Sequence, residues 1–258
     1  MDDLIDDLVA EQDDLDAAIC ETPATLWLAP SPAEGWLMRD CIAHLADLDE
    51  TAAIIAETGE YPKRERRAGE GALAAGQVDA RALTIPELLA WWRASRARLA
   101  AALRKTDPKA RLPWAGMAMG ARSFATARLM EAWSHGLDAR DAAGVPHHDT
   151  DRLRHIAHLG YSTRDFAYRA RGMEPNTAPL YVEVIAPSGA VWTWGLPEAA
   201  DRITGTASDF CRVVTQRIHY SDTALVATGD AAREFLVIAQ AFAGPPGAGR
   251  PPRGESEG

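Results

Sequence analysis

The segment that most constrains the fold of this chain is SFATARLMEAWSHGLDARDAAG, residues 123–144. Its first residue, a serine, can cap the start of a helix, and its last, a glycine, can close the end, so both boundaries have a local physical cause. Within it, Glu131 and His135 lie four residues apart, and Asp138 follows three residues later. Side chains at these spacings share one face of a helix. The segment therefore predicts a helix with a polar line along one face.

This polar line is expected to face a hydrophobic core, because Phe124 and Ala127 precede it and Ala142 follows it. A buried carboxylate and a buried imidazole are costly unless they are paired or bound to a metal. Two interpretations fit the pattern. Glu131 and His135 either hydrogen-bond to each other inside a helix bundle, or they bind a metal ion together.

A second histidine lies on the apolar seam of the helix predicted for residues 37–58, which should stop at Gly59. Apolar residues recur along that helix with an a/d spacing, and His44 occupies one position of the seam. A lone histidine in a core is more often a structural residue than a ligand. Asp40 and Asp47 flank His44 along the helix. They are either acceptors that orient a metal-bound imidazole or solvated surface acids.

Four segments have the apolar periodicity of amphipathic helices, which predicts a helix bundle. These are residues 2–20, 37–58, 84–106 and 123–144. The third begins with a capping box formed by Thr84 and Glu87. In a bundle the inward faces of the second and fourth helices meet, so we expect His44 to approach Glu131 and His135. Three such ligands leave a fourth position open for water or substrate, as in catalytic zinc sites.

The connections between these helices carry weaker signals. Residues 59–83 are charged and rich in Gly and Ala, which predicts a solvated loop without assigned chemistry. Residues 110–122 are expected to form an irregular approach to the fourth helix, and this approach brings Trp114 and Arg122 to the site.

The pattern changes beyond the bundle, which is assigned to residues 1–146. A connecting helix is predicted within residues 147–174. Residues 175–243 combine short β-like runs with helical segments and predict a small α+β domain. Residues 244–258, rich in Gly and Pro, are expected to be disordered.

Two histidines of the connecting helix, His155 and His158, form a rival metal-ligand pair. They lie on a side of the helix rich in arginine, so this pair ranks below the first site. The elements predicted for this half of the chain are a helix over 151–171, a hairpin of 181–185 and 191–194, an edge strand at 202–204, a helix capped by Thr206 and running through Ile218, a strand at 223–228, and a helix capped by Asp230 and ending at Phe242.

Composition excludes several functional classes. The 258 residues carry a formal net charge of -10 and no basic run interleaved with aromatic residues, so no nucleic-acid partner is expected. The N-terminus is acidic where a signal peptide would be basic, and no apolar run approaches the ~20 residues of a membrane span. The protein is therefore expected in the cytoplasm. Its three cysteines lack metal-site spacing and are expected to be reduced core thiols.

The chain resembles the mycothiol-dependent maleylpyruvate isomerase branch of the DinB-like metal-binding superfamily, and especially an uncharacterised metal-binding subgroup. The resemblance covers almost the whole chain. It is carried by GWLMRDCIAHLADLDE (35–50), the segment 123–144, and a C-terminal part with VWTWG, ITGTASDFCRVVTQR and TALVATGD. It implies a fold of class α + (α+β), in which a DinB-like four-helix bundle precedes a small sterol-carrier-like α+β domain.

The resemblance also implies a site. In that branch the bundle binds a divalent metal, usually taken as zinc, through residues that correspond to His44, Glu131 and His135 here. The isomerase also uses an arginine of its C-terminal domain, for which Arg217 is the nearest match and Arg212 the next.

The chemistry expected of such a site is thiol activation. A coordinating cation lowers the ~8.5 pKa of a free thiol, and the thiolate of mycothiol or a similar small thiol could then attack an electrophilic substrate. Arg122 or Arg217 could hold a substrate carboxylate. Asp47 and Asp138 could orient the ligands, or each could form a salt bridge with a nearby arginine.

The favoured function is therefore a metal-dependent isomerase or S-transferase that uses a low-molecular-weight thiol and acts as a monomer or small homo-oligomer. Two alternatives stay open. The same metal centre could serve thiol-independent hydrolase, lyase or cyclase chemistry. The protein could instead be a non-catalytic binder of a metal and an apolar ligand.

Overall fold

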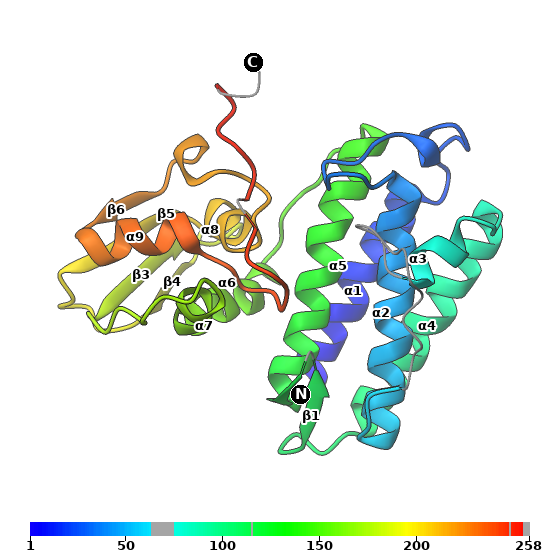
Figure 1. Cartoon of the computed structure of the whole chain (residues 1–258), viewed down its shortest axis with the longest axis horizontal. Coiled ribbons are helices and arrows are strands. Elements are labelled where there is room, and N and C mark those ends of the chain that lie inside the picture. The colour runs from blue at the N-terminus through cyan, green and yellow to red at the C-terminus, as the bar shows by residue number, and fades with distance from the viewer. Residues whose placement is uncertain (63–74, 115, 248, 255–258) are drawn as a thin grey trace. The chain divides into compact units, whose positions relative to one another are not determined.

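The computed structural model describes residues 1–62, 75–114, 116–247 and 249–254. The chain divides into two compact units, unit 1 (Met1–His147) and unit 2 (His148–Gly258). Unit 1 is mostly helical, and unit 2 combines a sheet with helices (Figure 1). The mixed helical and sheet class predicted from the sequence is confirmed.

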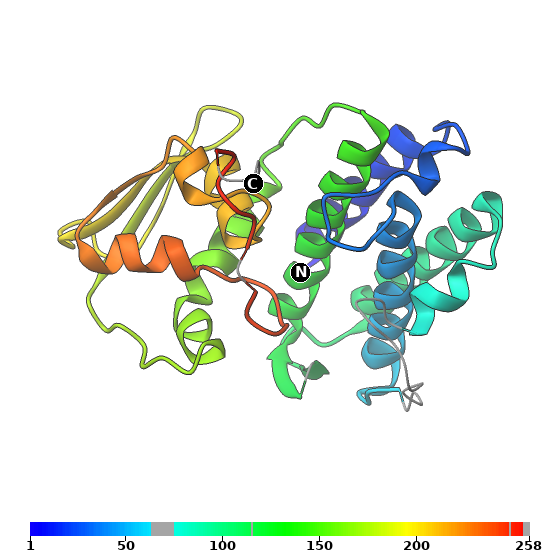
Figure 2. The same ribbon diagram turned by 45° about the horizontal axis from the view of Figure 1, so that its top comes forward.

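In unit 1 four long helices pack around a common core. α2 contacts α4 and α5, and α1 contacts α5 and α4. α2 lies between α4 and α5 in both views (Figure 1 and Figure 2). The elements of this unit are α1 (Asp2–Ile19), η1 (Leu26–Leu28), α2 (Met38–Thr58), α3 (Ala75–Ala80), α4 (Ile85–Lys105), β1 (Arg111–Trp114), β2 (Met117–Gly120) and α5 (Ala121–Ala143).

Several helix boundaries of unit 1 were predicted correctly because local chemistry decides them. Gly59 and Gly144 end α2 and α5 with φ values of 74° and 69°, the left-handed conformation that favours glycine. Thr84 and Glu87 form the expected capping box at the start of α4. Between helices, Asp16 of α1 accepts hydrogen bonds from two arginines of α4.

Three predictions for unit 1 were wrong. α5 begins at Ala121 with Gly120 as its N-cap, so Ser123 lies inside the first turn and caps nothing. The approach predicted to be irregular forms an antiparallel hairpin, in which Leu112 pairs with Met119. Part of the predicted loop 59–83 forms the short helix α3, while residues 63–74 of that loop lie outside the described residues.

Unit 2 contains a four-stranded mixed sheet of order β4-β3-β5-β6, in which only the β3–β5 pair is parallel. α6, α8 and α9 contact this sheet. The elements are α6 (Leu153–Ser162), α7 (Arg164–Ala170), β3 (Leu180–Ile185), β4 (Val191–Trp194), β5 (Asp201–Thr206), α8 (Ala207–Val214), η2 (Tyr220–Asp222), β6 (Val226–Thr228) and α9 (Asp230–Ile238).

The predicted hairpin of β3 and β4 is confirmed, and so is the Thr206 cap, whose side chain accepts from the Asp209 amide. Other details were wrong. β5, expected at the edge of the sheet, lies between β3 and β6. The helix capped by Thr206 ends at Val214, and the following strand spans three residues.

Two helix predictions for unit 2 also need correction. The single helix predicted over 151–171 is interrupted at Thr163, whose hydroxyl donates to the Leu159 carbonyl. Asp230 is the first residue of α9 and not its cap, and α9 ends at Ile238. The Asp201 carboxylate of β5 accepts instead from the amides of the next two residues of α9.

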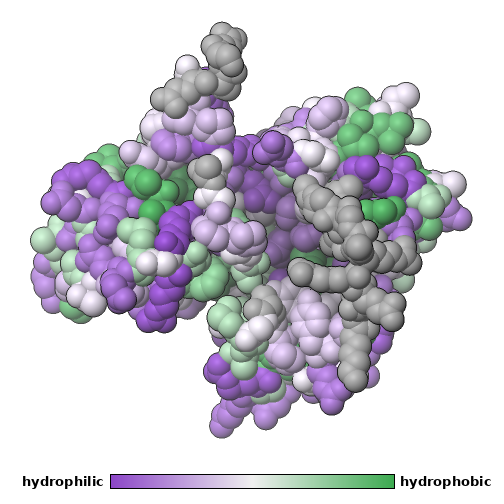
Figure 3. All heavy atoms as spheres, viewed as in Figure 1, coloured by the Kyte–Doolittle hydropathy of each residue, from purple (hydrophilic) through white to green (hydrophobic). Residues whose placement is uncertain are grey.

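Of the three cysteines, Cys41 and Cys211 are buried as expected, but Cys20 is exposed. Within the tail predicted to be disordered, the Gly247 carbonyl accepts from Arg171 and the Arg253 amide donates to Asp222. The surface drawn in Figure 3 is mostly polar, with hydrophobic residues in separate areas. None of the helices in the described part of the chain combines the length and apolar character that a bilayer-spanning helix requires.

Candidate metal centre

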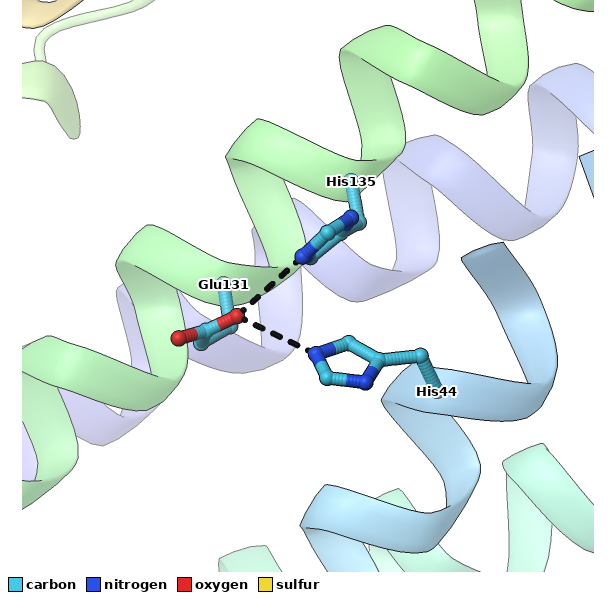
Figure 4. Close-up of side chains that lie close together, drawn as sticks. All are labelled: His44, Glu131 and His135. Atoms are coloured by element: carbon cyan, nitrogen blue, oxygen red, sulfur yellow. Dashed lines mark ion pairs between the residues drawn. The ribbon is translucent and has the colours of Figure 1, made fainter. Parts of the chain in front are cut away.

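Three side chains predicted as ligands converge between α2 and α5 (Figure 4). His44 comes from α2, and Glu131 and His135 lie one turn apart on α5. The Nε2 atom of His44 lies 3.5 Å from Glu131 Oε2, and the Nε2 atom of His135 lies 3.4 Å from the same oxygen. The packing of two helices therefore brings together groups 87 residues apart in the chain (44 to 131).

The site is largely sheltered from solvent. The side chains of His44, Glu131 and His135 keep only 20%, 17% and 13% of their accessible surface. The polar line of α5 therefore faces inward, as the sequence predicts, but its ligand atoms are not sealed from small molecules.

Neighbouring groups fix the orientation of both imidazoles. Trp36, from the loop before α2, stacks on His135 with ring centroids 5.2 Å apart and lies 5.0 Å from His44. The Nδ1 atom of His135 lies 3.3 Å from Oδ2 of Asp138, whose side chain is buried. The carboxylate thereby directs Nε2 of His135 toward Glu131, as outer carboxylates do for metal-bound histidines.

The protonation states of His44 and Glu131 suit metal binding. Burial lowers the pKa of His44, and the neighbouring His135 lowers it further, so His44 is neutral near pH 7. Burial opposes ionisation of Glu131, but the close imidazoles of His135 and His44 outweigh it and hold its pKa well below the usual range. A neutral imidazole and an ionised carboxylate are the forms that bind metals.

The spacing of the donor atoms also suits an ion. A direct N–H···O hydrogen bond spans about 2.9 Å. The 3.4 and 3.5 Å separations are longer. They are close to the edge of about 3.3 Å between ligands of a tetrahedral zinc with bonds of about 2.0–2.1 Å. Two histidines and one carboxylate are also a donor set of catalytic zinc sites.

The acids flanking His44 on α2 have other contacts. Asp40 accepts from Arg81 at 3.0 and 2.6 Å and from the Leu37 amide at 2.8 Å, so it holds the start of α2. Asp47 lies against α3, because a Cβ added to Gly76 would come within 2.5 Å of its Oδ1.

The predicted arginines belong to other segments of the chain. Arg122 is exposed in the first turn of α5. Arg217 belongs to unit 2, where its Nη1 donates to the Thr215 carbonyl, and Arg212 pairs there with Asp149. The catalytic roles suggested for these arginines stay predictions.

Contacts of the rival pair, His155 and His158, can be described for His158. His158 packs against Trp194 with centroids 6.5 Å apart, and its Nε2 lies 3.4 Å from the Ser162 hydroxyl. Among the described residues, neither histidine belongs to a group of three potential ligands.

A second group of potential ligands, Glu11, Asp14 and His147, has a structural explanation. Trp133 Nε1 donates to His147 Nε2 at 3.2 Å, which occupies the lone pair that a metal would need. Arg140 pairs with Asp14 at 3.0 Å. These contacts tie the end of α5 to α1.

The sequence analysis missed Arg128, one turn before Glu131 on the same face of α5. It is 2% exposed, and its Nε and Nη1 atoms have no hydrogen-bond partner among the described residues. Its guanidinium lies 4.0 Å from the centre of the Trp114 ring and 6.0 Å from that of Phe124. The only available sequence signal was its spacing of three residues from Glu131.

Comparison with known proteins identifies the class. Residues 3–140 match the family described as Mycothiol maleylpyruvate isomerase N-terminal domain. This match covers more than half of the chain, so the chain belongs to that family, and the predicted resemblance is confirmed. Residues 176–228 match a family described as Wyosine base formation. The likeness of unit 2 to sterol-carrier-like domains stays a prediction.

Two full-length relatives are the uncharacterized proteins MT0041 and Rv0036c, from two strains of Mycobacterium tuberculosis. Each is 47% identical over 249 residues, which cover 95% of this chain and 96% of the relative.

Two crystal structures share the fold. They are the mycothiol-dependent maleylpyruvate isomerase and a histidine-to-alanine mutant of it, each with a TM-score of 0.58. The alignments cover 87% and 86% of this chain and 91% of each isomerase chain, at 18% and 17% identity. At this identity the likeness establishes the fold alone.

Proposed function

We propose that this protein is a divalent-metal-dependent enzyme that uses a low-molecular-weight thiol, mycothiol or a close analogue, for isomerase or S-transferase chemistry on a small electrophilic substrate. The observation that carries the proposal is the convergence of His44, Glu131 and His135 on one point between α2 and α5. Membership in the mycothiol maleylpyruvate isomerase family supports the choice of thiol.

In this proposal the three side chains hold the ion, and zinc is the metal that their donor set favours. When bound, zinc supplies the means to lower the pKa of a thiol from about 8.5, so that a thiolate is available near neutral pH. Trp36 and Asp138 keep the imidazoles in the binding orientation. The low exposure of the ligands limits the access of bulk water.

The reaction needs no external oxidant or reductant. The thiolate sulfur forms a bond to an electrophilic carbon, and the electron pair of the substrate double bond moves onto the conjugated carbonyl. In an isomerase, rotation about the resulting single bond precedes cleavage of the C–S bond, which returns the thiol and the double bond. In a transferase the C–S bond is retained, and the enolate takes up the proton that the thiol lost.

The test incubates the full chain, loaded with zinc, with mycothiol and an α,β-unsaturated carbonyl compound. We expect a conjugate or a geometric isomer, detected by mass spectrometry and NMR, that is lost after metal removal and in His44→Ala. His147→Ala, which lies outside the proposed ligand set, is the matched control and should retain the reaction. A metal-loaded protein that forms neither product with mycothiol or any other small thiol would exclude thiol chemistry and favour the hydrolase, lyase or cyclase alternative.

A further inference from the structure

Arg128 has a charge that its surroundings do not satisfy. The side chain is 2% exposed, and within the described part of the chain neither Nε nor Nη1 has a hydrogen-bond partner. Buried polar groups in native proteins are nearly always hydrogen-bonded, and a buried charge is nearly always paired. The other buried arginine of α5 obeys this rule, because Arg140 donates to Asp14 and to the Pro146 carbonyl.

The contacts of Arg128 explain the position of its guanidinium group, but these aromatic contacts provide no acceptors for its Nε and Nη1 donors. Its guanidinium lies over the Trp114 ring at 4.0 Å, and Phe124 packs edge-on against the same tryptophan. A cation over an aromatic face gains favourable energy, but stacking leaves the N–H groups in the guanidinium plane without acceptors. The hairpin of β1 and β2 therefore holds Arg128 in place while its donors stay available.

The nearby carboxylates do not supply the missing acceptor. Glu131 faces the two histidines of the metal centre. Asp49 accepts from Gln12 at 2.8 Å, and burial raises its pKa to about 7, so it is only partly ionised near neutral pH. A divalent cation on the three ligands would add two further positive charges to this buried region.

The position of Arg128 indicates what kind of group could pair with its positive charge. Side chains three residues apart on a helix have Cβ atoms about 5–6 Å apart, so Arg128 and Glu131 are neighbours on the inward face of α5. An anion held by Arg128 would thus lie within the length of a small molecule from the metal ligands. Guanidinium groups bind carboxylates and phosphates in particular, through paired N–H donors.

We infer that Arg128 binds an oxyanion group, a carboxylate or a phosphate, of the small molecule that reacts at the metal centre. This inference rests on the proposed function and assigns it a substrate class, an electrophile with an anionic group. Arg128 is the buried anion-binding residue inferred for unit 1, whereas Arg122 is exposed.

The experiment measures binding of succinate, inorganic phosphate and uncharged succinamide by calorimetry, to the full chain with zinc and after chelation. We expect zinc-loaded wild type to bind succinate or phosphate but not succinamide. Arg128→Met should lower the affinity for the bound anion by at least about 10-fold. Arg128→Lys, which keeps the charge, should lower the affinity by less. The choice between succinate and phosphate identifies the anionic group.

Measurements of protein stability distinguish a binding role of Arg128 from a structural role. Because Nε and Nη1 of the buried Arg128 have no hydrogen-bond partner within the described residues, Arg128→Met should unfold at the same or a higher urea concentration than wild type. The matched control, Arg140→Met, loses satisfied hydrogen bonds and should be less stable, yet bind the anion as wild type does.

Unchanged anion affinity in Arg128→Met, or no binding of either anion by wild type, would overturn the inference. Failure of the proposed function would look different. A protein that takes up no zinc but still binds the anion through Arg128 would retain the inferred site without the metal chemistry.

Discussion

Burial shifts the pKa of individual residues in unit 1, and Asp49 of α2 is the clearest case. It is 3% exposed, and burial raises its pKa from 3.8 to about 7, although Arg128 and Arg96 act in the opposite direction and Glu131 in the same one. Gln12 donates to Asp49 Oδ2 at 2.8 Å. The carboxyl group is therefore more readily protonated in the folded chain than in the unfolded chain.

This difference predicts how stability depends on pH. Between pH 4 and pH 7 the folded state retains a proton that the unfolded state has lost, so the contribution of Asp49 to stability falls as pH rises through this window. Asp49→Asn keeps an acceptor for Gln12 and removes the titration. We expect it to raise the free energy of unfolding by roughly 2–4 kcal/mol above pH 7, with little change near pH 4.

The measurement is urea unfolding of wild type and Asp49→Asn across pH 4–8, in a chelator so that metal binding does not contribute. Parallel stability curves for the two proteins would show that Asp49 does not titrate differently on folding.

Residue-scale features were also the hardest to predict. The pairing of Glu131 with His135 could be predicted because it depends on helical spacing alone. The isolation of Arg128 depends on which groups surround it after folding, and those include Trp114 of a hairpin that was not predicted. Sequence spacing contains no information about unsatisfied donors.

Whole elements were predictable where local signals decide their ends. Glycines in the left-handed conformation end α2 and α5, and a capping box starts α4. The hairpin before α5 was missed because its strands have four residues each and include Pro113, which lacks a backbone donor. The position of β5 inside the sheet was missed because strand order is a property of tertiary packing.

Close packing between elements gives a test at this scale. In unit 2, α6 approaches α8 through Gly160, where an added Cβ would lie 2.7 Å from Val214 Cγ2. Gly160→Ala should therefore destabilise the protein by about 1–3 kcal/mol, despite the better helix propensity of alanine. In a Val214→Ala background, which makes room for the methyl group, the same substitution should be neutral or stabilising.

Urea unfolding of the two single variants and the double variant measures this coupling. An equal cost of Gly160→Ala in both backgrounds would show that the contact with Val214 does not limit the approach of the two helices.

At the scale of the whole molecule, the fold and family agree with the motifs from which they were predicted. A helical unit belonging to the mycothiol maleylpyruvate isomerase N-terminal domain family precedes a unit built on a mixed sheet. The convergence of His44, Glu131 and His135 could be predicted because they lie on two long helices with regular periodicity. The anion-binding role inferred for Arg128 could not be predicted, because it depends on contacts formed only after folding.

The central claim is that His44, Glu131 and His135 bind one divalent cation, and metal analysis of the purified full chain tests it most directly. We predict about one zinc per chain in wild type, and at least about a 10-fold loss of affinity in both His44→Ala and His135→Ala, while His147→Ala binds zinc as wild type does. Full metal occupancy in both ligand variants, or a wild type that binds no divalent cation, would contradict the account.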